Sequence, residues 1–131
     1  MQELTLEERD IYRAIGELAY VIATVDNVLS KSEKVVFTEA VKEDLGRNSW
    51  LALDRFEQLE NEQIDHNLDA TYNRVLFVIR KNKDVLTEDH IEKFISVLEK
   101  VAGVSGVSEE ELAIINQFQV DVKRIYKQNN S

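Results

Sequence analysis

The stretch YRAIGELAYVI, residues 12–22, decides the fold class of this chain. Its apolar side chains recur every three or four positions, which places them on one face of an α-helix, whereas a half-buried strand would alternate at every second residue. The stripe is made up of Tyr12, Ile15, Leu18, Ala19 and Ile22. The same period continues along the rest of the chain, so the sequence predicts an all-α protein.

The breaks in this period mark the expected helix boundaries. The chain has no proline and only four glycines, so long helices meet few interruptions. Gly46 suits the left-handed position that ends a helix, while Gly16, inside a helical pattern, is expected to let another helix approach closely. The acidic stretch at 60–67 leaves open whether the third and fourth helices are separate. We expect about six helices, beginning near Thr5, Ser30, Trp50, Leu68, Thr87 and Ser108.

The composition fits one folded domain over residues 1–131, long enough to bury a core without cross-links. Cysteine is absent, which excludes disulfides, thiolate zinc sites and cysteine nucleophiles and suits a reducing compartment. No apolar run approaches the ~20 residues that cross a bilayer, and the N-terminus lacks the pattern of a signal peptide. We therefore predict a soluble, cytoplasmic protein with no membrane insertion.

The charge balance argues against a nucleic-acid partner. The chain carries 25 acidic and 16 basic residues, a formal charge of −9, whereas binding to phosphate backbones depends on lysine and arginine. The basic residues gather near 80–83 and 123–127. Both groups are expected at helix C-termini, where cations offset the helix dipole.

Two segments of the chain look like copies of one unit. Ile15, Leu18 and Val21 match apolar residues 80 positions later, and Ser30 and Glu33 match a serine and a glutamate 78 positions later. Each copy reads as a helix, a short loop, Ser-x-x-Glu and a second helix. The sequence therefore predicts two related helical hairpins.

The loop of the first copy carries a family motif. The segment ATVDNVLSKSE, residues 23–33, resembles the signature of the TerB-like (tellurite resistance protein B-like) family, Ala-x-x-Asp-Gly-x-(Ile/Val)-Ser-x-x-Glu. Asn27 replaces the usual glycine, and asparagine also tolerates the left-handed backbone region. The second copy, AGVSGVSEEE at 102–111, keeps the glycine, serine and glutamate. It has Ser105 in place of the aspartate and lacks one loop residue.

The resemblance implies an all-α fold that often carries the signature twice, and a link to tellurite resistance or stress response. The family's molecular activity is poorly defined, and a divalent-cation role has been proposed for its acidic loops. Carried over to this chain, that role reaches Asp26 and Glu33 in the first copy. In the second copy it reaches only Glu111, because Ser105 is a poor ligand for a hard cation.

The same residues have an explanation that needs no metal. Ser30 caps a helix while Glu33 returns a hydrogen bond to its backbone, and Asp26 closes a turn. This interpretation is favoured over a cation site, because calcium usually takes six or more oxygens.

A second polar group lies further along the chain. Glu62, His66 and Asp69 share one face of a helix and could in principle bridge a metal, but a solvated polar face is the favoured interpretation. His90 is expected to decorate the first turn of its helix.

No catalytic motif is present: the sequence lacks a Gly-x-Ser-x-Gly elbow, a phosphate-binding loop and a dinucleotide fingerprint. We expect no enzyme and no cofactor beyond a weakly bound divalent cation. Phe77 widens the apolar surface of its helix, which fits central burial or a partner, with burial favoured. The aromatic residues expected in the core are Phe37, Trp50, Phe56, Tyr72, Phe77, Phe94 and Phe118.

The leading hypothesis is a non-enzymatic binding or scaffold domain of TerB-like type that acts through protein contacts. The alternative is a weak divalent-cation sensor or buffer that uses the loop from Asp26 to Glu33. A carboxylate-based hydrolase is a distant third. The sequence identifies neither the protein partner nor the oligomeric state.

Overall fold

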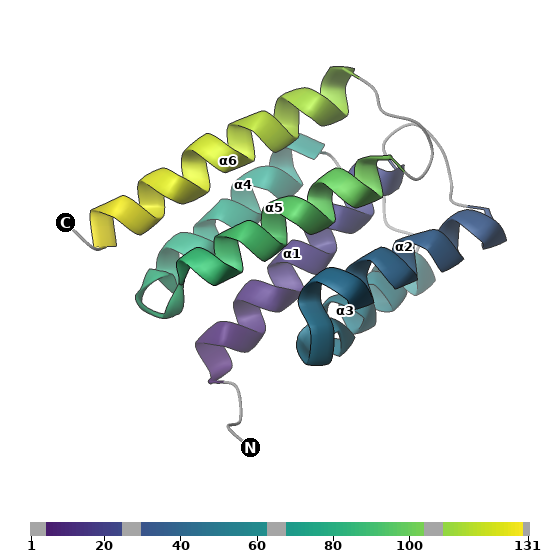
Figure 1. The fold of residues 1–131 in the computed structure, drawn as a ribbon, viewed down its shortest axis with the longest axis horizontal. Coiled ribbons are helices and arrows are strands. Elements are labelled where there is room, and N and C mark those ends of the chain that lie inside the picture. The colour runs from purple at the N-terminus through teal and green to yellow at the C-terminus, as the bar shows by residue number, and fades with distance from the viewer. Residues whose placement is uncertain (1–4, 25–29, 63–67, 104–108, 130–131) are drawn as a thin grey trace.

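The computed structural model describes residues 5–24, 30–62, 68–103 and 109–129. The regular structure in these ranges is helical and contains no strand, which confirms the all-α prediction (Figure 1). None of the helices in these ranges has the length and apolar character that a bilayer crossing needs. The elements are α1 (Leu6–Thr24), α2 (Lys31–Leu45), η1 (Gly46–Asn48), α3 (Ser49–Glu62), α4 (Leu68–Lys81), η2 (Lys83–Val85), α5 (Glu88–Ala102) and α6 (Glu109–Asn129).

Local side chains set several helix boundaries, as the sequence predicted. The Glu8 backbone N–H donates to Thr5 Oγ1 at 3.1 Å at the start of α1, and a reciprocal capping box at Ser30 opens α2. Gly46, just past the end of α2, has a φ of 60°, which side chains with a Cβ rarely adopt. These caps satisfy backbone groups that a helix end would otherwise leave without a partner.

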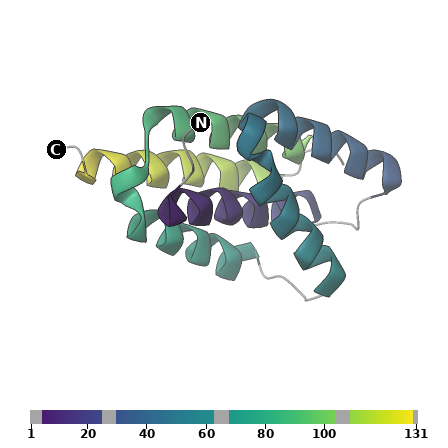
Figure 2. The ribbon, with the colours of Figure 1, turned by 90° about the horizontal axis from the view of Figure 1, so that it is seen from below.

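Helix α1 runs through the middle of the molecule and the others surround it. It packs directly on α3, α4 and α5, while α2 bridges α3 and α5, and α6 bridges α4 and α5. Figure 2 shows the result: α2 and α5 lie on one side of α1 and α4 lies on the other, while α3 runs obliquely past α1 from the α2 side. Most of the α1 side chains are buried, and Gly16 lets α3 come close to its backbone. The predicted close approach at Gly16 is therefore confirmed.

The predicted pair of related hairpins is not confirmed. Helices α5 and α6 pack directly on each other, but within the described residues α1 and α2 have few direct contacts. Instead, α2 packs on α5 and α3. The second segment is therefore a packed helix pair, whereas the two helices of the first segment lie apart (Figure 1).

Two aromatic residues expected in the core lie on the surface. Trp50 is 55% exposed and Phe77 is 62% exposed. Near Trp50, α3 buries the neighbouring Leu51 and Ala52, and Phe77 sits on the side of α4 away from the buried Val75 and Ile79. Both expectations were wrong. The apolar stripes of α3 and α4 are wider than the area that packs against α1, so part of each stripe stays exposed to solvent.

Candidate functional site

The loop motif at the start of α2 forms a reciprocal capping box. The Glu33 backbone N–H donates to Ser30 Oγ at 3.2 Å, and Glu33 Oε1 accepts the Ser30 backbone N–H at 2.9 Å. The predicted cap is confirmed. Asp26, the other residue of the hypothesised cation site, lies outside the described residues. One carboxylate oxygen of Glu33 is therefore already engaged in holding the helix end.

The second hypothesised metal group, Glu62, His66 and Asp69, is described only in part. Asp69 is exposed in the first turn of α4, while His66 and the side chain of Glu62 lie outside what the structure describes. Among the described residues, no three histidine, aspartate or glutamate side chains are close enough to hold a metal ion. Glu111 lies buried in the first turn of α6.

His90 lies in the first turn of α5, but it is buried there, at 7% exposed, and does not decorate the surface. This differs from the expectation from the sequence. His90 Nδ1 accepts the Thr87 backbone N–H at 3.2 Å, and the backbone N–H of His90 donates to Thr87 Oγ1 at 3.1 Å. The ring stacks on Phe94 and meets Tyr12 edge-on. Burial lowers the pKa of His90 below its ordinary value, although the nearby Glu8 carboxylate acts in the opposite direction. His90 is thus both a helix cap and a core residue.

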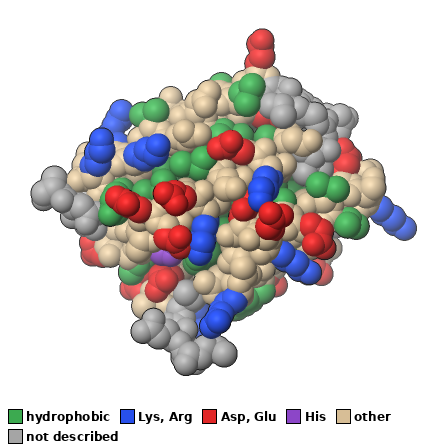
Figure 3. All heavy atoms as spheres, viewed as in Figure 1, with side chains coloured by type: hydrophobic (Ala, Val, Ile, Leu, Met, Phe, Trp, Pro, Cys, Tyr) green, Lys and Arg blue, Asp and Glu red, His purple; other side chains and the backbone are tan. Residues whose placement is uncertain are grey.

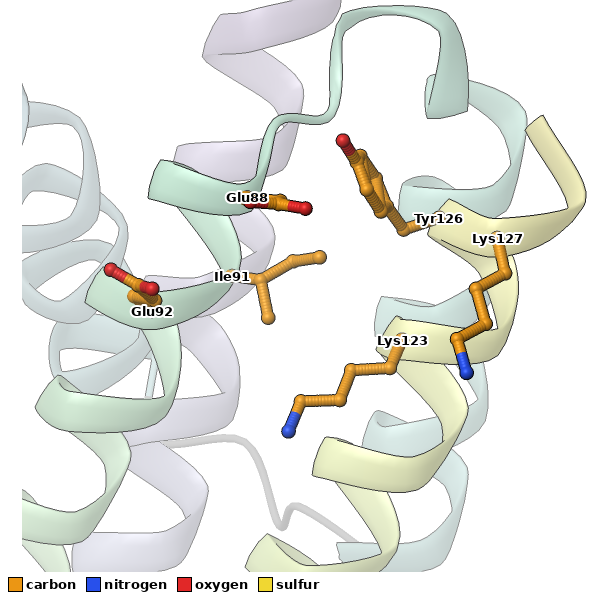
Figure 4. A pocket seen from close by; sticks show the side chains of 6 residues that line it. All are labelled: Glu88, Ile91, Glu92, Lys123, Tyr126 and Lys127. Atoms are coloured by element: carbon orange, nitrogen blue, oxygen red, sulfur yellow. The ribbon is translucent and has the colours of Figure 1, made fainter. Parts of the chain in front are cut away.

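A groove follows the line where α5 and α6 pack together. Two cavities of about 270 and 490 Å³ lie along it and share Ile91, Glu92 and Lys123 in their walls. Figure 4 shows Ile91 pointing into the space between the helices, with acidic side chains on the α5 side and Lys123, Tyr126 and Lys127 on the α6 side. We call this feature the α5–α6 groove. Its walls are Glu88, Ile91, Glu92, Ile95, Ser96, Glu99 and Lys100 from α5, and Gln119, Lys123, Tyr126 and Lys127 from α6.

The two walls of the α5–α6 groove carry opposite net charge, because three glutamates outnumber Lys100 on α5 and the charged residues on α6 are lysines. Glu88 and Glu92 lie one turn apart on α5, and Lys123 and Lys127 lie one turn apart on α6. Within the described residues, no ion pair shorter than 4.0 Å joins one wall to the other. Apolar side chains show between these helices in the space-filling view (Figure 3). The groove therefore presents an apolar floor between two rows of charge.

The sequence predicts a different role for Lys123 and Lys127, as cations at a helix C-terminus. The structure places Lys127, but not Lys123, in the last turn of α6. The i, i+4 spacing within each pair was visible in the sequence. What was missing was the position of one row relative to the other, because α5 and α6 are separate elements. Only the packed pair brings the two rows together.

Comparison with profiles of known families, with curated proteins and with solved structures found no match to this chain. The TerB-like resemblance therefore rests on the loop segments at 23–33 and 102–111. The centres of both segments, residues 25–29 and 104–108, lie outside the described ranges.

Proposed function

We propose that this chain is a non-enzymatic binding or scaffold domain of TerB-like type, which acts through protein contacts at the α5–α6 groove. One observation carries the proposal: opposed rows of charge flank an apolar floor and are not joined to each other by ion pairs in the described residues. Polar contacts around an apolar centre are the usual layout of a protein-binding surface. The absence of cysteine suits a cytoplasmic setting for such a domain.

The shape of the groove favours a helical partner segment. It runs along two packed helices, and an amphipathic helix laid over such a surface places its apolar face on the floor. A matching segment would carry apolar residues opposite Ile91 and Ile95. Its basic side chains would face Glu88 and Glu92, and its acidic side chains would face the lysines of α6. Charge complementarity of this kind sets orientation and excludes wrong partners.

The alternative, a divalent-cation sensor at Asp26 and Glu33, receives less support. Glu33 already accepts a backbone hydrogen bond in the capping box. A cation would have to compete for that carboxylate with the helix end, whose disruption typically costs about 1 kcal/mol. A role in tellurite resistance or stress response follows from the family resemblance alone.

The repeat also remains a proposal. The first copy has its capping box at Ser30, and the second has Glu111 buried at the corresponding place in the first turn of α6. A shared ancestry of the two loops would account for this, even though α1 and α2 do not pack as α5 and α6 do. Replacing Ser108 by alanine should then cost as much stability as replacing Ser30.

Affinity capture from cells with a charge-reversed variant tests the binding surface. Tagged wild type is compared with Lys123→Glu/Lys127→Glu, and Lys31→Glu/Lys42→Glu on the exposed part of α2 serves as the control with the same change in net charge. We expect a partner that wild type and control retain and the groove variant loses. Reversing acidic residues in that partner's helix should restore its binding to the groove variant. Equal capture by all three proteins would refute the assignment of the groove.

A further inference from the structure

Residues of α1, α3 and α4, together with Asn82, line a separate open cavity of about 310 Å³. Four basic side chains line it, against two carboxylates, so the local balance is an excess of two positive charges. The whole chain has a formal charge of −9. We call this the cationic groove, and its charged residues are Asp10, Arg13, Glu17, Arg55, Arg74 and Lys81.

A buried carboxylate holds part of the cationic groove in place. Glu17 is 6% exposed, lies 3.5 Å from Arg55 and pairs with Arg74. Gln58 Oε1 accepts hydrogen bonds from Arg55 at 2.9 Å and from Arg13 at 3.3 Å. These contacts fix guanidinium groups from three helices around one space. A site held this way loses little side-chain freedom when a ligand binds.

The need to balance the charge of Glu17 does not explain why all four cations line the cationic groove. A buried carboxylate is costly unless it is paired, and Arg55 and Arg74 both meet that need. Arg13 and Lys81 are not among the groups paired with Glu17. They line the same cavity and supply charge beyond what the buried acid requires.

An exposed aromatic ring stands at the edge of the same cavity. Phe77 lines the cationic groove and lies on α4 between Arg74 and Lys81, at spacings of three and four residues. Those spacings place the three side chains on one helix face. An exposed phenylalanine next to guanidinium groups offers an apolar contact directly beside a charged one.

We propose that the cationic groove is a docking site for an acidic segment of a partner protein. Two carboxylates of the segment meet Arg13, Arg74 and Lys81, and a neighbouring apolar side chain packs on Phe77. The excess of two positive charges matches two carboxylates, and arginine binds carboxylate groups through paired hydrogen bonds. The cationic groove shares no residue with the α5–α6 groove, so this proposal stands whether or not that groove binds a helix.

The features of the cationic groove favour a peptide over other anionic partners. A phosphate concentrates two charges on one group near Asp10 and Glu17, whereas the two carboxylates of a peptide are separate groups that can each approach a cation. A nucleic acid carries a charge on every phosphate along its length, so beyond the groove it would meet the acidic surface of a chain with net charge −9.

Nuclear magnetic resonance titration with a synthetic peptide tests the proposal. The probe contains two adjacent glutamates followed by leucine, and the comparison peptide has glutamines in their place. The protein variant Arg13→Gln/Lys81→Gln removes two charges and leaves the pairing of Glu17 with Arg55 and Arg74 in place. Lys31→Gln/Lys42→Gln on exposed positions of α2 is the matched control.

We expect the glutamate peptide to shift backbone signals around residues 10–17 and 74–81. The glutamine peptide should not. The variant should weaken binding at least about tenfold, because it removes two of the three cations that meet the carboxylates of the peptide. The control should bind as wild type does. Equal shifts with both peptides, or shifts confined to other helices, would overturn the proposal. A phosphoserine peptide or anionic vesicles that bind where the glutamate peptide does not would overturn it in favour of those ligands.

Discussion

Gly16 of α1 lies directly against the backbone of Ala52 in α3. A Cβ atom on Gly16 would fall 2.6 Å from both the Cα and the carbonyl oxygen of Ala52, closer than real Cβ atoms approach. The atoms in the way belong to helix backbone, which cannot turn aside as a flexible side chain can. The spacing between the two helices is therefore set by the absence of a side chain at this residue.

This contact predicts that Gly16→Ala is destabilising. Alanine favours a helix over glycine by about 1 kcal/mol, but overpacking of a tight interface costs about 1–3 kcal/mol or more. We expect a net loss in the free energy of unfolding, measured by urea denaturation. Gly103→Ala is the control, because its Cβ would meet its nearest neighbour at an ordinary 3.5 Å. A Gly16→Ala protein as stable as wild type would show that the helices separate at little cost.

The capping box at α2 predicts a measurable effect of Ser30→Ala. Removing the Oγ atom deprives the Glu33 backbone N–H of its acceptor, which should cost about 1 kcal/mol of stability. Glu33→Gln is the control, since its amide oxygen still accepts the Ser30 N–H and should leave the denaturation midpoint almost unchanged. If Ser30→Ala also leaves the midpoint in place, the serine has another role, and a ligand at this loop becomes the better explanation.

Calorimetric titration with calcium and magnesium tests the cation hypothesis. We expect a dissociation constant no lower than about millimolar, because two carboxylates and a few carbonyls supply fewer oxygen ligands than these cations prefer. The comparison protein is Asp26→Asn/Glu33→Gln. Micromolar binding by wild type that disappears in this variant would make the cation sensor the leading function. Binding that survives in the variant would point instead to Glu62, His66 and Asp69.

The burial of His90 predicts a stability that depends on pH. Because burial holds the pKa of His90 below its ordinary 6.5, the unfolded chain takes up the proton more readily than the folded one. The stabilisation is therefore fully present above the unfolded pKa and is lost as the pH falls below about 6.5. Protonation of Nδ1 would also remove the acceptor for the Thr87 N–H.

Two variants separate this effect from other titrations. His90→Gln keeps an acceptor at the capping position but does not titrate, so its stability should fall less than that of wild type between about pH 7 and pH 5.5. His66→Gln is the comparison, because it removes the other histidine of the chain and leaves His90 in place. Thermal melts across this range would contradict the prediction if His90→Gln and wild type lose stability in parallel.

The helices and their caps were predictable because their causes lie within a few residues. The period of the apolar side chains gives each helix, and Thr5 and Ser30 act on backbone groups three positions away. The exposure of Trp50 and Phe77 to solvent was not predictable in the same way. Periodicity shows which face of a helix is apolar, but it does not show how much of that face a neighbour covers.

The candidate sites were harder to predict because they depend on contacts between distant residues. Glu17 and Arg74 are 57 positions apart, and nothing near either of them in the sequence marks the other. Their meeting requires the packing of α4 on α1. The α5–α6 groove was easier to predict, because each row of charge lies on one helix at regular spacing. Only the relative position of the two rows had to come from the structure.

The central position of α1 has a consequence for how the protein is made. This helix leaves the ribosome ahead of α3, α4 and α5, the elements that cover it. The apolar surface of α1 is therefore not fully covered until α5, which ends at Ala102, has been synthesised. Such late, long-range contacts slow folding and leave apolar surface exposed to aggregation. We therefore expect a chaperone that shields residues 6–24 during synthesis to reduce aggregation of the unfinished chain.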